Sequence, residues 1–218
     1  MKIVLLFVSV LTSSFLQSQI MVLHDPVSAR VFSTDKYSGV NGSPFLYNKW
    51  MAGSATIEKG YYNNLELKFD VYGNTLYFNK DDEPYEFQDD VKSFILMPTV
   101  TDSSTYQYFK KGISGGGIKA NQFVQVLFEG PLSLYKSDIK LMSEVNEINV
   151  GVVKTFTSSS RYFIKKDNTL QLIKLNKKEV FDVIKDKEDK INSYVTEKKL
   201  SAKKDSDLIA ILKYYNTL

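Results

Sequence analysis

The spacing of apolar residues changes once along this 218-residue chain, and that change limits the folds it can adopt. Before residue 176, apolar and polar residues alternate, most clearly from Leu65 to Tyr72. Alternation of this kind predicts strands with one buried face. After residue 176, apolar residues recur at every third or fourth position, as on one face of a helix. Strands first and helices last predict an α+β fold rather than an alternating α/β fold.

The strand region is divided by turn residues. Gly73-Asn74 tolerate positive φ and predict a two-residue hairpin turn after the strand at 65–71. Asp167-Asn168 predict a second hairpin turn. We expect strands at 65–71, 75–79, 85–87, 91–96, 105–109, 123–128, 132–135, 162–164 and 169–175, with a glycine-rich loop at 112–117. Residues 155–160 are polar. Together they predict a mainly antiparallel sheet or a small sandwich.

The end of the chain predicts three short helices. Asn176 and Glu179 have the spacing of a capping box, which marks a helix start. Further helical segments are expected at 187–200 and 205–215. Helices this short are not stable alone, so we expect each to pack on the sheet or on its neighbours. We therefore assign residues 20–175 to a β-rich domain and residues 176–218 to a helical segment of the same globular unit.

Residues 1–19 have the pattern of a secretory signal peptide. Lys2 precedes an apolar run from Ile3 to Leu11, and Ser18-Gln19 is a plausible cleavage junction. The run is shorter than the roughly 20 residues that span a bilayer. An uncleaved anchor and a buried N-terminal strand are the alternatives. We expect an exported protein in the periplasm, associated with the outer membrane, or outside the cell.

The side chains that usually carry chemistry are scarce. The chain has no cysteine and one histidine, which excludes thiolate nucleophiles, disulfides and multi-histidine metal sites. His24 precedes Asp25, but adjacent side chains on an extended segment point apart, which disfavours a catalytic pair. Gly115–Gly117 lack the lysine and hydroxyl context of a phosphate-binding loop and predict a sheet connection. No metal and no cofactor are expected.

Two acidic clusters are candidates for a carboxylate-based hydrolase of the glycosidase type. Asp82 and Glu83 belong to the first cluster, and Asp89 and Asp90 to the second. Such an enzyme needs two carboxylates at a set separation across a cleft. The clusters lack the spacing of a calcium-binding loop. Solvated charge in turns is the alternative interpretation.

Trp50, Tyr61 and Tyr62 are the candidate ligand-binding residues, because exposed aromatic rings stack on sugars and pack against partners. Core packing is the alternative interpretation for the same rings. The C-terminal segment is rich in lysine, but its lysines are interleaved with acidic residues at helical spacing. That pattern is typical of a solvated helix face, so no nucleic-acid partner is expected.

Four stretches of the sequence resemble a known protein family: Trp50–Gly53, Tyr61–Phe78, Phe128–Tyr135 and Tyr214–Leu218. Together they resemble a family of uncharacterised secreted proteins of Bacteroidota bacteria. The resemblance implies a location in the Gram-negative envelope or outside the cell, and it implies no catalytic residue.

The sequence therefore predicts an exported, non-catalytic envelope or secreted protein that binds a partner protein, a glycan or an apolar ligand. The hydrolase is one alternative. A periplasmic lipid carrier, with an apolar pocket between the curved sheet and a helix, is another.

Overall fold

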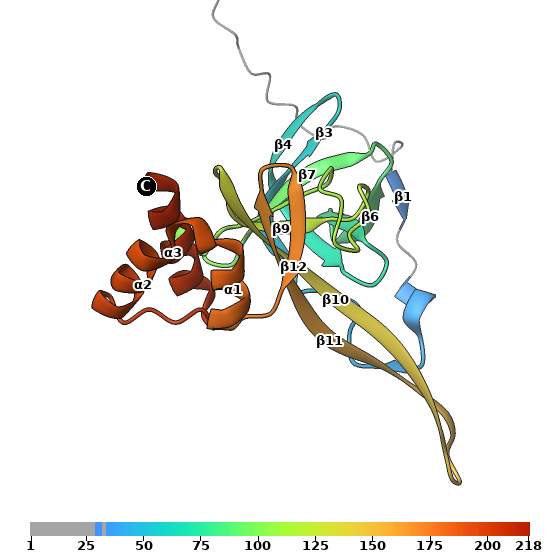
Figure 1. Ribbon diagram of the computed structural model, residues 1–218. Coiled ribbons are helices and arrows are strands. Elements are labelled where there is room, and N and C mark those ends of the chain that lie inside the picture. Colours follow the sequence, from blue (N-terminus) through green and yellow to red (C-terminus); the bar gives the residue numbers. More distant parts are fainter. Residues whose placement is uncertain (1–28, 32–33) are drawn as a thin grey trace, which may run out of the picture.

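The computed structural model describes residues 29–31 and 34–218. These residues form one 12-stranded sheet and three helices near the C-terminus (Figure 1). The strand order is β1-β6-β5-β4-β3-β7-β8-β9-β10-β11-β12, and β2 pairs with β11 in the one parallel ladder. The α+β class and the mainly antiparallel sheet are confirmed, whereas a sandwich is not. The predicted signal peptide and His24 lie outside the described residues.

The strands are β1 (Ala29–Val31), β2 (Val40–Asn41), β3 (Met51–Ile57), β4 (Gly60–Asp70), β5 (Thr75–Lys80), β6 (Glu83–Phe87), β7 (Val91–Met97), β8 (Gln107–Lys110), β9 (Val124–Phe128), β10 (Leu132–Glu147), β11 (Gly151–Lys166) and β12 (Thr169–Ile173). The helices are α1 (Lys177–Val183), α2 (Glu188–Glu197) and α3 (Asp205–Thr217). Within this part of the chain, no helix has both the length and the apolar character needed to cross a membrane.

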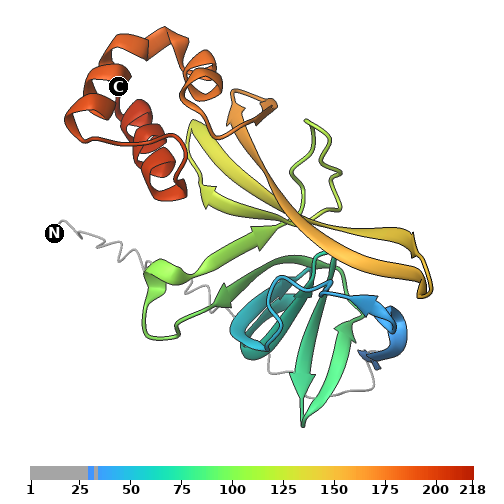
Figure 2. The same ribbon diagram turned by 90° about the horizontal axis from the view of Figure 1, so that it is seen from below.

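The first half of the sheet is strongly curved (Figure 2). Its buried residues form an aromatic-rich core. The ring of Phe69, near the end of β4, contacts three others. Its centroid is 5.2 Å from that of Phe94, 5.6 Å from that of Phe109 and 5.7 Å from that of Phe123. Rings at these separations contribute about 0.5–1.5 kcal/mol per pair beyond the area they bury. The alternation that predicts β4 from the sequence comes from this buried face.

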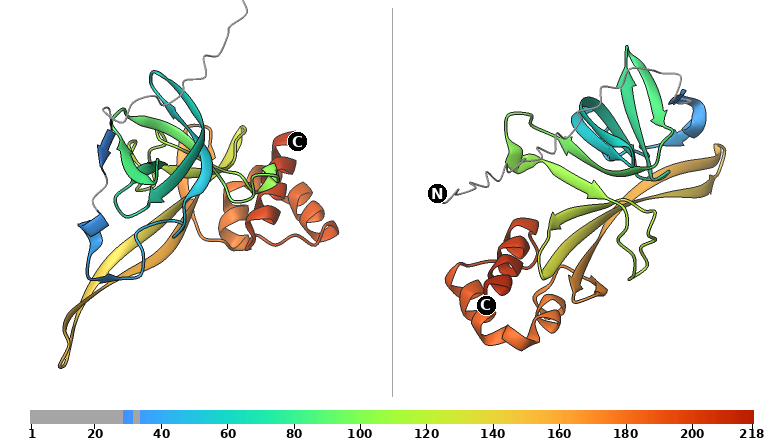
Figure 3. Two further views of the ribbon diagram at one scale, coloured as in Figure 1. Left: turned by 180° about the vertical axis from the view of Figure 1, so that it is seen from behind. Right: turned by 90° about the horizontal axis from the view of Figure 1, so that it is seen from above.

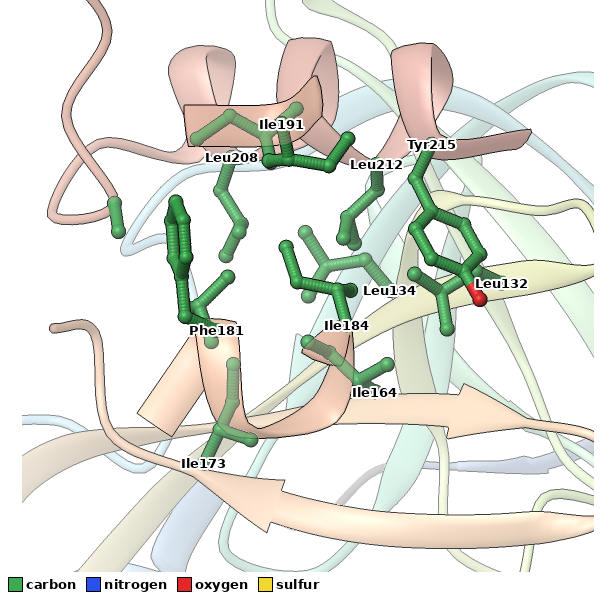
Figure 4. Packing of buried hydrophobic residues seen from close by; sticks show 13 residues of the cluster. Leu132, Leu134, Ile164, Ile173, Phe181, Ile184, Ile191, Leu208, Leu212 and Tyr215 are labelled. Carbon is green, nitrogen blue, oxygen red and sulfur yellow. The ribbon is translucent and has the colours of Figure 1, made fainter. Parts of the chain in front are cut away.

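A second core lies between the helices and the base of β10, β11 and β12 (Figure 4). Its fully buried members include Leu134 from β10 and Ile164 from β11, together with Ile184, Leu208 and Leu212 from the helical segment. The amphipathic spacing after residue 176 is the signature of this shared core.

The cap of α1 differs in part from the predicted capping box. Asn176 Oδ1 accepts a hydrogen bond from the Glu179 backbone N–H at 2.9 Å, as predicted. The Glu179 carboxylate does not return to the Asn176 N–H. It accepts instead from the Lys174 N–H at 2.7 Å. The carboxylate therefore joins the end of the preceding strand to the first turn of the helix.

The glycine-rich loop between β8 and β9 packs on the sheet. A Cβ on Gly116, whose φ is +59°, would lie 3.1 Å from the Phe163 ring. Ile118 from the loop shares a buried cluster with Val124, Tyr135 and Phe163. This arrangement agrees with a sheet connection.

β10 and β11 each have 16 residues and form a hairpin that projects from the body of the molecule (Figure 1). The sequence predicts only its base, 132–135 and 162–164, as strand. The polar stretch 155–160, for which no strand is predicted, lies inside β11. Neither face of the outer hairpin is buried, so the apolar alternation that identifies half-buried strands is missing there.

The β4–β5 turn is also different from the prediction. Asp70 pairs with Thr75, so the turn contains four residues, Val71–Asn74, instead of two. Asp70 Oδ1 accepts a hydrogen bond from the Gly73 N–H at 2.7 Å. An aspartate that binds backbone three residues ahead fixes a longer turn, and the Gly-Asn pair does not reveal this.

Candidate functional site

The three aromatic candidates do not form one surface. Trp50 precedes β3, and the Lys68 Nζ lies 5.6 Å from its ring centre. Tyr61 and Tyr62 pair with Thr56 and Ala55 at the other end of β3. Because β3 runs from Met51 to Ile57, the two positions are separated by about 20 Å along the strand. All three side chains are half-buried, and Tyr62 packs near Phe87.

The acidic candidates occupy two separate turns. Asp82 and Glu83 lie at the exposed β5–β6 turn, and Asp82 has a φ of 62°. Asp89 accepts a hydrogen bond from Lys59 at 3.2 Å. Asp90 is bound by two lysines, and a hydrogen bond from Lys111, followed by one from Lys92, lowers its pKa. A general acid of a glycosidase needs a raised pKa, so these contacts work against that role.

In the described part of the chain, no group of three or more metal-binding side chains comes together.

The most suitable binding site is a hollow of about 610 Å³ at the root of the projecting hairpin. The segment that contains β2 runs beside the hairpin there (Figure 3). Backbone pairing of Val40 with Lys154 and of Asn41 with Thr155 holds the two together. The hollow is lined by residues from three parts of the chain: Lys36, Tyr37, Ser38, Gly39, Val40, Tyr72, Gly73, Met142, Val152 and Lys154.

An aromatic cluster forms one wall of the hollow. The ring centroids of Tyr37 and Tyr72 are 5.8 Å apart, and each ring meets the buried Phe156 ring edge to face at 5.5 and 5.1 Å. Tyr72 nevertheless remains 41% exposed. The wall therefore presents an aromatic ring to solvent while Phe156 supports it from the β11 side.

A buried carboxylate fixes this wall. Asp70 is fully buried, and its Oδ2 accepts a hydrogen bond from the Tyr37 hydroxyl at 2.6 Å. Lys36 Nζ lies 3.6 Å from the same oxygen. Gly73 is required at the turn, because a Cβ there would lie 2.5 Å from Asp70 Oδ2 and 3.1 Å from Lys36 Nζ.

The ionisation states in this cluster follow from its contacts. Burial and the hydrogen bond to Asp70 raise the pKa of Tyr37, so its hydroxyl stays a neutral donor. Burial lowers the pKa of Lys36, but the hydrogen bond with Tyr37 and the nearby Tyr77 and Asp70 outweigh this and raise it. Lys36 therefore remains a cation at neutral pH.

Lys154 is the second charged residue of the lining. Its Nζ lies 2.8 Å from Glu144 Oε1, and this hydrogen bond raises its pKa. Both charged residues that line the hollow are therefore lysines, while Tyr72, Met142 and Val152 supply apolar surface. Such a lining suits a small molecule that combines an apolar or aromatic body with an anionic group.

None of these lining residues is among the binding candidates predicted from the sequence. Tyr72 takes a polar position in the alternating run, and Met142 and Val152 lie in the part of the hairpin that carries no strand signal. The site exists because β2 pairs in parallel with β11, more than one hundred residues further along the chain. A two-residue strand such as β2 leaves no periodicity by which to detect it.

Comparison with protein-family models, with curated proteins and with solved structures finds no match for this chain.

Proposed function

We propose that this is an exported, non-catalytic binding protein whose hollow takes a small amphipathic anion. The observation that carries the proposal is the hollow at the hairpin root, where an exposed tyrosine ring and two apolar side chains adjoin two lysines. Its volume of about 610 Å³ falls within the range of small-molecule sites.

The apolar part of the ligand would lie against Tyr72, Met142 and Val152. Tyr72 and Val152 are exposed without a ligand, so covering them removes apolar surface from water. Each 40 Å² covered in this way contributes about 1 kcal/mol. The anionic group would approach Lys36 or Lys154, whose charges are maintained by Asp70 and Glu144.

The alternatives fit the geometry less well. A lipid carrier with its pocket between sheet and helices needs space there, but Leu134, Ile184 and Leu212 fill that interface as fully buried side chains (Figure 4). A hydrolase needs carboxylates across one cleft, but the candidates belong to two turns.

Export rests on residues 1–19 and on the resemblance to secreted proteins. Recovery of the protein from the periplasm or medium of a Gram-negative host, with its N-terminus near Ile20, is the expected result.

Binding can be tested with anilinonaphthalene sulfonate, an aromatic anion whose fluorescence rises in apolar surroundings, titrated against the purified full chain. We expect Tyr72→Ala to weaken binding about fivefold, which corresponds to about 1 kcal/mol of lost apolar contact. Tyr108→Ala is the matched control, because Tyr108 is similarly exposed but lies on β8, outside the hollow.

The charge preference gives a second measurement. Neutral phenylnaphthylamine should bind more weakly than the sulfonate, and Lys154→Met should reduce the difference between the two probes. Equal losses in Tyr72→Ala and Tyr108→Ala, or no preference for the anion, would show that the hollow is not the binding site.

A further inference from the structure

The outer part of β10 is a strand with one unused edge. β10 pairs with β9 only from Leu134 to Lys136, whereas its pairing with β11 continues to Glu147. In the described part of the chain, no other strand pairs with β10 beyond Lys136. The backbone N–H and C=O groups along the far edge of 137–147 are therefore available to another strand.

This edge lacks two of the features that usually prevent strand addition, proline and a β-bulge. It contains no proline, and the irregularity in the β9 ladder lies before it, between Leu134 and Tyr135. It is also part of the most apolar exposed stretch. Half of the large exposed hydrophobic residues among the described ones lie between 141 and 152: Leu141, Val145, Ile148, Val150 and Val152. A concentration of this kind marks an interaction surface.

The sequence of the edge is complementary to itself. Ile139 and Val145 lie three residues on either side of Met142, and Lys140 and Glu144 lie two residues on either side. We propose that two copies of this chain pair β10 with β10, antiparallel, across a two-fold axis at Met142. Each Lys140 then faces Glu144 of the second copy, and each Ile139 faces its Val145.

Neighbouring registers are less favourable. Moving the axis to Leu141 places Asp138 opposite Glu144, a repulsive pair. Moving it to Ser143 places Lys140 opposite Asn146 and Ile139 opposite Glu147, so the ion pairs and the Ile139–Val145 pairs are lost. Directly opposed side chains stabilise or destabilise a strand pair according to their charge and apolar character, and each pair occurs twice in the two-fold arrangement. Of the three axes, only the one at Met142 places each Lys140 opposite a carboxylate.

The space beside the edge agrees with this register. A hollow of about 410 Å³ is lined by Asp138, Ile139 and Lys140, and its lining also includes Lys119, Asn121 and Gln122. In the proposed pair, residues 144–146 of the second copy lie opposite 138–140 and enter this hollow. Glu144 of the second copy would then meet Lys140, which has no ion pair within the described residues, with Lys119 nearby.

The absence of cysteine makes the axis directly testable. Directly opposed residues of an antiparallel pair have Cα atoms about 4.5–5.5 Å apart, within reach of a disulfide. Under mild oxidation, Met142→Cys should form a covalent dimer that reductant dissociates. Val145→Cys is the matched control. Its two copies would lie about 20 Å apart, so it should not cross-link alone, but it should do so when mixed with Ile139→Cys.

Charge reversal tests the same register without cysteine. Lys140→Glu and Glu144→Lys should each weaken self-association of the full chain about tenfold in sedimentation velocity, because each places like charges opposite one another. An equimolar mixture of the two variants restores both ion pairs and should associate as the unaltered protein does.

Two outcomes would overturn the proposal. One is an unaltered chain that sediments as a monomer at 0.1 mM, roughly the concentration at which weak dimers form, together with no cross-link in Met142→Cys. The other is cross-linking of Met142→Cys and Val145→Cys to the same extent, which would indicate random collision or pairing in another register. Probe binding in the hairpin-root hollow is measured separately, so either result leaves the proposed function untouched.

Discussion

At the scale of single residues, Asp70 has a role that its position in the sequence conceals. In the alternating run it occupies the polar face, where solvent exposure is expected. The structure buries it completely, with the Tyr37 hydroxyl, the Gly73 N–H and Lys36 around it. The reason is local: the four-residue turn folds back over the end of β4, and the segment before β2 covers the carboxylate.

We predict that Asp70→Ala lowers the free energy of unfolding by about 3 kcal/mol, because it leaves a buried hydroxyl, a backbone N–H and a lysine without their acceptor. Urea denaturation followed by circular dichroism measures this. Asp89→Ala removes an exposed ion pair with Lys59 and should cost under about 0.5 kcal/mol. Asp70→Asn keeps one acceptor oxygen and should lie between them. Equal stability of the Asp70→Ala and Asp89→Ala variants would contradict the role assigned to Asp70.

At the scale of elements, α3 is attached to the sheet by the Asn216 side chain, which makes two hydrogen bonds to the β10 backbone. Asn216 Oδ1 accepts a hydrogen bond from the Leu132 N–H at 2.9 Å, and Asn216 Nδ2 donates to the Leu132 carbonyl at 3.0 Å. The side-chain amide therefore satisfies both backbone groups at the start of β10. Gly130 makes room for it, since a Cβ there would lie 2.5 Å from Asn216 Nδ2.

We predict that Asn216→Ala destabilises the protein by about 1–3 kcal/mol, because both Leu132 backbone groups lose their partner. Asn216→Asp is the sharper variant. Its carboxylate still accepts from the Leu132 N–H but places an oxygen against the Leu132 carbonyl, so it should also destabilise. Thr217→Ala, next to it on the exposed side, should change little. Thermal unfolding of the three variants separates these cases, and an unchanged midpoint for Asn216→Asp would refute the two-bond arrangement.

At the scale of the whole molecule, the folded body and the projecting hairpin are distinct. The three buried clusters include no residue between 144 and 155. The hairpin tip is almost fully solvated, with Ile148 90% exposed. Burial supplies most of the free energy of folding, so the outer hairpin contributes little to it. A solvated apolar arm that does not stabilise the body is more readily explained by association.

We predict that replacing Val145–Val153 with Asn-Gly, which joins the paired residues Glu144 and Lys154 through a short turn, leaves the urea midpoint almost unchanged. The same variant should lose the proposed β10 pairing and, because Val152 is removed, part of the probe binding. A fall in stability as large as that of Asn216→Ala would mean that the arm belongs to the folding core.

The sequence by itself determined the elements that have one buried face. Each predicted strand corresponds to one of β4 to β12, and the helices begin at the cap residue Asn176, because burial of one face imposes a period that the residues must follow. β3 was missed, since small residues such as Gly53 and Ser54 interrupt its apolar pattern, and the outer hairpin was missed because neither of its faces is buried.

Only the tertiary structure decided where function could reside. The hairpin-root hollow forms because the backbone of Val40 pairs with that of Lys154. The edge of β10 is free beyond Lys136 because its pairing with β9 stops there. Trp50, Tyr61 and Tyr62 were reasonable candidates by residue type, yet the length of β3 separates the first from the other two. The local spacing of apolar residues indicates which face of an element is buried. It does not indicate which distant segment lies beside that element, because such pairing depends on the packing of the whole chain.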